Sequence, residues 1–457
     1  MTNAPLGRRA PSAGGNLLAT RGCKTLDNVI GGGTTMRTPP TRLLAGLLVL
    51  LLVVLIVPMA PAQVALAQQK VSLRFWMAAD PVLEAAIDEL LKGFMRANPT
   101  VTVQRDAFPF NEYHQKITTA SASGDPPDVF WMDVRVAAFA AQGSLLVLAK
   151  YLTPQNKGDI IESGLIEPVW KGQIYGVPMH ELTEGLFVNR AMFDEAGIKI
   201  PQRLEDAWTW DEFVNHARRL TKRAGDRTDV WGFGVLRHLS DWSILPVIIQ
   251  NNGSVLSADL KKATGALNSP ATVEAMKWYQ DLFTRHRVIA VDPIPDGFPT
   301  GRIAIFQAPS TYRAFLDRRF PDFKYAVVPM FKGKRCAVTA GGWNVSIAAK
   351  TKSPDVAWSL TDYLTREKHA DWVRASGYLP VRKSVIDKER QFRQYPWDIF
   401  TTQLQKCAIH RPHTAAYNYL FDTFLAVAKD IALGRDVQRT LDDAGGRLDA
   451  ALARGGR

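Results

Sequence analysis

The sequence predicts an α/β protein built from two domains. The first observation is length: the chain has 457 residues, 46% of them hydrophobic, which suits two hydrophobic cores better than one. The second is order, because strand-like and helix-like segments alternate near the start, as in a parallel sheet covered by helices. The third is the lack of a Pro-rich or Gly-rich linker. We therefore expect the chain to cross between its two domains more than once.

The first strand and helix follow residue 70. Residues 71–77 (VSLRFWM) alternate in polarity, as a strand does. The next segment carries an apolar stripe at helical spacing, opens with Asp80 as N-cap and Pro81 in the first helical position, and ends at Asn98-Pro99. A second strand over 100–108 completes a βαβ unit, which predicts parallel pairing.

The alternation continues to about residue 142. We expect a helix around 111–123, a short buried strand over 128–132 and a helix around 135–142. Ligands of open α/β sheets bind beyond the carboxyl ends of the strands. Because Trp76 and Asp133 stand at two such ends, both are candidate ligand-binding residues.

The rest of the chain is richer in helix patterns, with a few extended segments. Helices are predicted over 209–225, 269–286, 353–365, 367–376 and 414–434, and extended segments over 324–330 and 343–350.

Residues 1–67 are typical of an export signal. Arg37 and Arg42 precede fifteen apolar residues, 43–57, and Ala65-Leu66-Ala67 is a small-residue cleavage site. Fifteen residues form about 22 Å of helix, which is shorter than the ~30 Å hydrocarbon core and disfavours a membrane anchor. We predict a signal peptide cleaved after Ala67 and a periplasmic or extracytoplasmic location.

The leader and the cysteines leave alternatives open. The stretch before Met36 is long for a signal, so Met36 is an alternative start, and Arg8-Arg9 keeps twin-arginine export beside the general route. Outside the cytosol, Cys336 and Cys407 could pair as a disulfide or stay as thiols.

Charge and motifs exclude several function classes. Residues 1–67 carry +5 of the net charge of +12, the remaining +7 is spread over the rest of the chain, and no basic run is dense enough to track a phosphate backbone. The chain contains no G-x-S-x-G, H-E-x-x-H or P-loop motif. His410 and His413 flank Pro412, which indicates loop histidines and not a metal site. We predict no nucleic-acid partner, no metal and no cofactor.

Tryptophans give the positive signal. Of twelve, four stand where helices or strands give way to loops: Trp76, Trp131, Trp242 and Trp343. An indole offers apolar faces and one donor, and a sugar has apolar C–H faces and a rim of hydroxyls. The set therefore favours a carbohydrate ligand, although each tryptophan alone could be a packing residue.

Residues 172–201 (GQIYGVPMHELTEGLFVNRAMFDEAGIKIP), followed by WTWDEF at 208–213, resemble the extracellular sugar-binding proteins of ABC importers, the group similar to maltose-binding protein. Further matches keep the family's order, including GDPPDVFWMD from 124, AGGWNVSIAAK from 340 and HRPHTAAYNYLFD from 410. The resemblance covers nearly all of residues 70–452. The chain departs from the family at FVNR, where Tyr-Asn-Lys is usual.

The resemblance implies a two-lobed periplasmic-binding-protein fold, with each lobe a mixed sheet flanked by helices and a hinge between them. One lobe would take residues 70–179 plus 339–384, and the other residues 180–338 plus 385–457. Matching the family's motifs position by position implies these ligand-binding residues: Trp76, Asp80, Asp133, Arg135, Glu181, Asp241, Trp242, Tyr312, Gly342, Trp343, Arg411 and Tyr417.

The function that the resemblance implies is solute capture. A monomeric binding protein would hold a sugar or small oligosaccharide in the cleft between its lobes and deliver it to the transmembrane subunits of an ABC permease, without catalysis. A polyol, glycerophosphodiester or opine is the alternative ligand. An exported carbohydrate-active enzyme and a sensor that partners a receptor are the alternative classes.

Overall fold

The computed structural model describes residues 70–455, which belong to one compact unit, Ala67–Arg457. The predicted leader lies outside the described residues. None of the helices in residues 70–455 combines the length and apolarity that a membrane crossing requires.

One mixed sheet of ten strands organises the described chain, with strand order β2-β1-β3-β11-β6-β9-β8-β7; β10 pairs with β6 and β12 with β11, and β4 and β5 form a separate two-stranded sheet. β1 is parallel to β2 and to β3, as the βαβ pattern predicts, whereas β11 is antiparallel to both β3 and β6. The strands are β1 Val71–Ala78, β2 Val101–Phe108, β3 Val129–Met132, β4 Val169–Trp170, β5 Gln173–Ile174, β6 Gly176–Asn189, β7 Lys222–Ala224, β8 Arg227–Val235, β9 Ile303–Pro309, β10 Tyr325–Val328, β11 Val338–Ile347 and β12 Ala408–Ile409.

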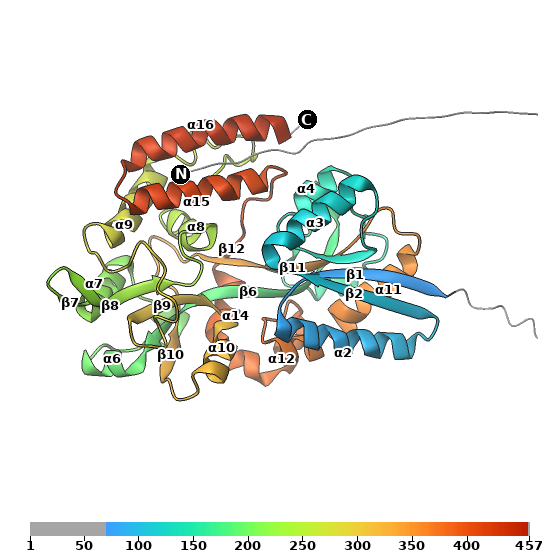
Figure 1. The fold of residues 1–457 in the computed structure, drawn as a ribbon, viewed down its shortest axis with the longest axis horizontal. Coiled ribbons are helices and arrows are strands. Elements are labelled where there is room, and N and C mark those ends of the chain that lie inside the picture. Colours follow the sequence, from blue (N-terminus) through green and yellow to red (C-terminus); the bar gives the residue numbers. More distant parts are fainter. Residues whose placement is uncertain (1–69, 456–457) are drawn as a thin grey trace, which may run out of the picture. The chain divides into compact units, whose positions relative to one another are not determined.

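Helices cover the sheet (Figure 1). β6 runs through the middle of the view, and α15 and α16 lie side by side at its upper edge. The helices are α2 Pro81–Ala97, α3 Phe110–Ser123, α4 Val136–Ala141, α5 Pro154–Gly158, α6 Arg190–Glu195, α7 Trp210–Leu220, α8 Asp241–Gln250, α9 Pro270–Phe283, α10 Tyr312–Arg319, α11 Pro354–Asp362, α12 His369–Ser376, α13 Lys383–Lys388, α14 Trp397–Lys406, α15 Tyr417–Ala432 and α16 Val437–Gly455. Short 3₁₀ turns span Ser163–Leu165, Leu204–Asp206 and Arg390–Arg393, and a π turn spans Tyr363–Glu367.

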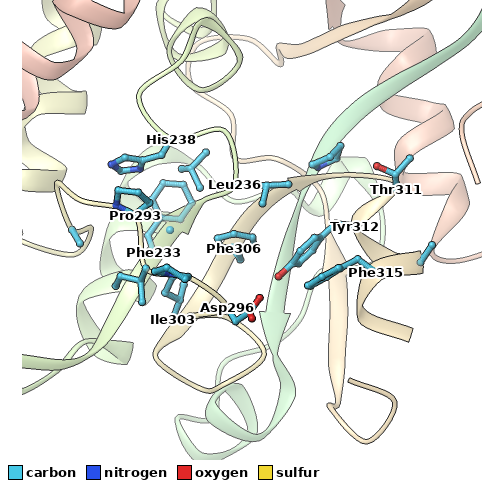
Figure 2. A pocket seen from close by; sticks show the side chains of 18 of the residues that line it. Phe233, Leu236, His238, Pro293, Asp296, Ile303, Phe306, Thr311, Tyr312 and Phe315 are labelled. Atoms are coloured by element: carbon cyan, nitrogen blue, oxygen red, sulfur yellow. The ribbon is translucent and has the colours of Figure 1, made fainter. Parts of the chain in front are cut away.

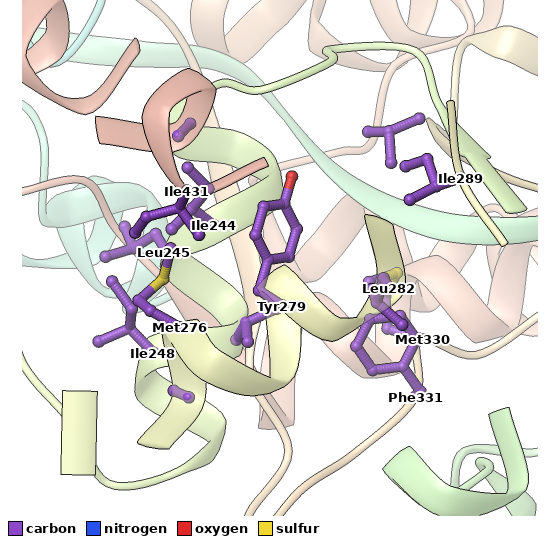
Figure 3. Packing of buried hydrophobic residues seen from close by; sticks show 14 of the residues in the cluster. Ile244, Leu245, Ile248, Met276, Tyr279, Leu282, Ile289, Met330, Phe331 and Ile431 are labelled. Carbon is purple, nitrogen blue, oxygen red and sulfur yellow. The ribbon is translucent and has the colours of Figure 1, made fainter. Parts of the chain in front are cut away.

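Buried apolar side chains form two large clusters and a smaller third one, which combines Ile161, Ala340, Leu379 and Val381 with residues between 187 and 404. One large cluster draws on residues 73–179 and 343–392; the other draws on 186–338 and 407–452, with Val134 added. Figure 3 shows part of the second cluster, where α8, α9 and α15 pack against one another. Each cluster combines segments that are distant in sequence, so the chain crosses between them more than once, as the missing linker predicts.

β6 and β11 connect these two regions. β6 pairs with β11 up to Thr183 and with β9 from Glu184 onward, and all fourteen of its residues are buried. β11 reaches back to β3 through residues 344–347. These two strands therefore carry the backbone from one cluster to the other.

One predicted helix is too long. The pattern over 209–225 predicts a single helix, but α7 ends at Leu220 and Lys222–Ala224 form β7, paired with β8. Gly225, with φ of 62°, makes the turn between the two strands. Cross-strand pairing to β8 thus overrides the helical pattern of the basic residues.

Cys336 and Cys407 form a disulfide, with their Cα atoms 5.4 Å apart. Cys336 stands just before β11, and Cys407 just before β12. The bond therefore joins the starts of two strands that pair in parallel, Val338 opposite Ala408.

Candidate functional site

A cleft of about 420 Å³ lies beside β6 and β11, the two strands that connect the two large apolar clusters. Its walls come from the chain after β1, after β3 and after β8, from the middle of β6 and β11, and from the start of α15. We call it the central cleft. It is lined by nine of the twelve predicted residues: Asp80, Asp133, Arg135, Asp241, Trp242, Gly342, Trp343, Arg411 and Tyr417. It is also lined by Phe110, His180, Arg237 and Tyr378, which the sequence did not single out.

Asp80 and Asp133 stand after β1 and β3, as the rule on strand ends predicts. The side chain of Asp80 accepts a hydrogen bond from the backbone N–H of Leu83 at 3.2 Å, so it caps α2 as expected. Asp133 is 4% exposed and accepts hydrogen bonds from the backbone N–H and the guanidinium of Arg135.

Charge keeps Asp133 ionised. Burial by itself would raise the pKa of the carboxyl group, but Arg135, His114 and Arg411 outweigh it and hold the pKa below its usual value. Burial in turn lowers the pKa of His114 to about 4, so its ring is neutral near pH 7. The carboxylate is therefore a charged acceptor for hydroxyl donors of a ligand.

Arg411 bridges two acids. It donates to Oε1 of Glu167 at 2.9 Å, and its other terminal nitrogen lies 3.9 Å from Asp133. Glu167 is 1% exposed, and Arg411 together with His410 outweighs burial and lowers its pKa. The pair needs Gly341 beside it, because a Cβ at Gly341 would lie 2.9 Å from the Arg411 guanidinium.

The cleft indoles are largely covered. Trp343 is 9% exposed, and the rings of His114 and Trp131 both stack on it, with centroid distances of 5.8 and 5.7 Å. Trp242 is 7% exposed, and the guanidinium of Arg237 lies 4.0 Å from the centre of its ring. Both indoles line the cleft, yet neither presents a wide open face.

Phe110 presents the open aromatic surface instead. Its side chain is 53% exposed, at the first turn of α3, with its ring edge-on to Trp343 at 6.1 Å. Sequence reasoning missed it because it considered only tryptophans and tyrosines. The aromatic residue that follows the end of β2 is the signal that could have found it.

Asp241 and Tyr417 form a buried pair across the cleft wall. The Tyr417 hydroxyl donates to Oδ2 of Asp241 at 2.7 Å, and the other carboxylate oxygen accepts from the backbone N–H of Trp242 at 3.0 Å. This pair fixes the start of α15 against the start of α8. Gly342 has a backbone role, since a Cβ there would lie 1.9 Å from the carbonyl oxygen of His180.

Three predicted residues lie elsewhere. Trp76 lines neither cleft nor pocket: its indole N–H donates to Asp106 at 3.0 Å, opposite it on β2, and its ring packs on Phe108. β1 continues two residues beyond Trp76, which moves the strand end to Ala78. Glu181 is buried on β6 behind the cleft, where burial and the nearby Glu167 charge raise its pKa well above the usual value.

Tyr312 lines a second space of about 570 Å³, which we call the aromatic pocket. Figure 2 shows Tyr312 beside Phe306 and Phe315, with its hydroxyl toward Asp296. This pocket shares Asp80, Leu83 and Tyr378 with the central cleft, so the two spaces adjoin. Within residues 70–455, no group of His, Cys, Asp and Glu side chains is arranged to hold a metal ion.

The chain belongs to a family of binding proteins. A sequence model of the family described as "Bacterial extracellular solute-binding protein" matches residues 80–371, more than half of the chain. A binding protein of Brucella abortus is 25% identical over 385 residues, which cover 80% of this chain and 89% of that protein.

Two solved structures are similar to this chain. An ABC transporter solute-binding protein from Thermotoga lettingae, bound with α-D-tagatose, has a TM-score of 0.72 and 24% identity over 83% of this chain and 99% of its own. UgpB from Mycobacterium tuberculosis, in complex with glycerophosphocholine, has a TM-score of 0.72 and 24% identity over 84% and 99%. These likenesses show the fold, which is the two-lobed periplasmic-binding-protein fold.

Proposed function

We propose that this protein works outside the cytoplasm, where it captures a sugar or small oligosaccharide in the central cleft and delivers it to an ABC permease. The observation that supports this most is the cleft itself, where a charged acceptor, Asp133, and a half-exposed aromatic ring, Phe110, face the same space. Hydroxyl groups suit the first and a sugar C–H face suits the second. The solute-binding protein from Thermotoga lettingae was solved with a sugar, α-D-tagatose, which favours this ligand class.

The adjoining aromatic pocket favours a ligand of more than one ring. Its 570 Å³ lies beyond Asp80 and Tyr378, and aromatic side chains line it. We propose that a first ring occupies the central cleft and that further rings extend toward Tyr312.

We also propose the lobes as the family resemblance gives them, residues 70–179 plus 339–384 and residues 180–338 plus 385–457. The two large apolar clusters support this division, because their members fall almost entirely on opposite sides of it, and the smaller third cluster packs residues of both sides together. A ligand that touches both lobes would bind the closed form more tightly than the open form and would therefore favour closure. The permease would recognise the closed monomer. Export would remove the leader after Ala67.

The second candidate ligand is a glycerophosphodiester or another polar solute. The observation that favours it is the three arginines in the cleft wall, Arg135, Arg237 and Arg411. UgpB of Mycobacterium tuberculosis, of similar fold, was solved with glycerophosphocholine.

A thermal-shift screen over mono-, di- and trisaccharides, polyols and glycerophosphodiesters tests the proposal. A bound sugar raises the melting temperature, since only the folded state binds it. Chromatography of the released ligand should return it unchanged, and a hydrolysed product would indicate an enzyme instead. A panel in which no sugar shifts the melting temperature contradicts the proposed function.

Phe110→Ala tests the site. Loss of a stacking ring should weaken sugar binding about five- to tenfold, equivalent to about 1 kcal/mol, with little change in the melting temperature of the unliganded protein, because the ring is half exposed. The matched control is Leu433→Ala, which removes an equally exposed apolar side chain at the end of α15. Calorimetric titration compares the two; equal effects would place the sugar elsewhere.

A further inference from the structure

Arg237 stands in the wall of the central cleft, two residues beyond the end of β8 and four residues before α8 begins. Its side chain is half-buried, and its guanidinium carbon lies 4.0 Å from the centre of the Trp242 ring. A guanidinium stacked on an aromatic face keeps its N–H donors in its own plane, directed outward from the edge of the stack. The residue is thus held in place while its donors remain available.

The other two cleft arginines have acidic partners. Arg135 donates to Asp133, and Arg411 donates to Glu167 at 2.9 Å. Among the described residues, by contrast, Arg237 donates no hydrogen bond and forms no ion pair within 4.0 Å. Arg237 therefore lines the cleft with N–H donors that have no acceptor among the described residues.

Nearby acids act on Arg237 through their charge, but none of them accepts a hydrogen bond from it. Asp241 is engaged by the Tyr417 hydroxyl at 2.7 Å and by a backbone N–H. Glu184 accepts a hydrogen bond from Gln307, and burial raises its pKa to about 7, so at neutral pH the carboxyl is ionised only about half of the time. Burial also lowers the pKa of Arg237, and the charges of Glu184 and Asp241 offset this lowering only in part. The cation thus carries a desolvation cost that an anion would relieve.

We infer that the solute bound in the central cleft carries an anionic group, a carboxylate or a phosphate ester, and that Arg237 binds this group through paired hydrogen bonds. This inference rests on the proposed function, and it narrows the ligand to a hydroxylated solute with one acidic substituent. Guanidinium and carboxylate or phosphate match in geometry, so two parallel N–H···O bonds form where a neutral hydroxyl would accept one. Asp133 and Phe110 remain available to the uncharged part of the same ligand.

Matched ligand pairs test the inference by calorimetric titration at low ionic strength. Each pair differs in the acidic group alone: D-glucose and D-glucuronate, D-galactose and D-galacturonate, glycerol and glycerol 3-phosphate. The acidic member of at least one pair should bind at least tenfold more tightly than its neutral partner, and the difference should shrink at high salt. The uronate arms identify a carboxylate as the recognised group, and the glycerol arm identifies a phosphate ester.

Variants assign the effect to Arg237. Arg237→Gln should weaken the acidic ligand at least tenfold and leave the neutral partner within twofold, and Arg237→Lys should retain part of the affinity because it keeps the charge. Arg227→Gln is the matched control, since this arginine begins β8, the strand that precedes Arg237, is 77% exposed, pairs with Asp229 and does not line the cleft. Equal weakening of both members of a pair by Arg237→Gln would mean that Arg237 only supports Trp242, and would overturn the inference.

The two levels of proposal fail differently. Binding of neutral sugars with equal or weaker binding of their acidic partners overturns the anionic ligand and leaves sugar capture intact. Failure of these pairs and of every saccharide in the thermal-shift screen to bind overturns sugar capture, and the inference with it.

Discussion

Glu184 is a carboxyl group in the interior of β6, fully buried and close enough to Arg237 for their charges to interact. One carboxylate oxygen accepts from Gln307, and the other has no hydrogen-bond partner among the described residues. Because burial raises the pKa to about 7, the folded protein holds a proton there that the unfolded chain releases near pH 4.5.

Glu184→Gln should therefore change the pH dependence of stability. Between about pH 4.5 and 7 the folded native protein binds more protons at this residue than the unfolded chain, so its free energy of unfolding falls as pH rises. The variant lacks this loss and should be more stable than the native protein by up to about 3 kcal/mol at pH 8, with no such gain at pH 4.5. Urea unfolding at both pH values measures it, and an equal difference at both would contradict the raised pKa.

At the residue scale, the sequence was informative where the position of a side chain in the fold follows directly from its position in the chain. Asp133 comes immediately after a buried strand, and the strand end brings it to the cleft. Trp76 was assigned by the same reasoning, but its role depends on which residue of β2 lies opposite it. That register is visible only in the tertiary structure. The same holds for the contact between Glu167 and Arg411 and for the lack of an acceptor for the donors of Arg237 in the described part of the chain.

At the scale of elements, the disulfide fixes a pair of strand starts. The bond closes a segment of 71 residues and joins the chain before β11 to the end of α14. β11 also supplies Gly342 and Trp343 to the cleft, so the bond anchors one end of a strand that lines the site.

Replacing both cysteines by alanine should destabilise the folded state by about 2–4 kcal/mol, because the unfolded chain regains the entropy of an open segment of this length. Urea unfolding of the double variant measures the loss, and dithiothreitol should destabilise the native protein alone. Sugar affinity should stay nearly unchanged, since neither cysteine lines the cleft. A variant as stable as the native protein would contradict a stabilising bond.

Elements with a clear period were predictable and β6 was not. The apolar stripe and the N-cap of α2 are recognisable in the sequence, and the helix spans Pro81–Ala97, as they predict. β6 carries His180, Glu181, Thr183 and Glu184 and is buried along its whole length, so it shows no alternation of polar and apolar positions. Only its pairing with β11, β9 and β10 identifies it as a strand.

For the whole molecule, β6 and β11 are the place where the two clusters of buried side chains are joined. Their pairing shifts register between Trp343 and Asn344, next to the cleft. We expect bending at this point to bring the cleft walls together around a ligand.

Saturation with the sugar that gives the largest thermal shift should therefore reduce the radius of gyration in small-angle X-ray scattering. Phe110→Ala at the same sugar concentration, below saturation for this variant, should show a smaller reduction. An unchanged scattering curve at full occupancy would mean that the sugar binds to a rigid cleft.

The sequence by itself determined the class of the fold, the early βαβ order and the family, because periodicity, caps and ordered motifs are local properties of the chain. The tertiary structure decided which charges meet. Arg135 finds Asp133 two residues away, but Arg411 finds Glu167 from 244 residues away, and Arg237 is left facing the cleft. Such pairings depend on distances through space, which only strand register and packing set.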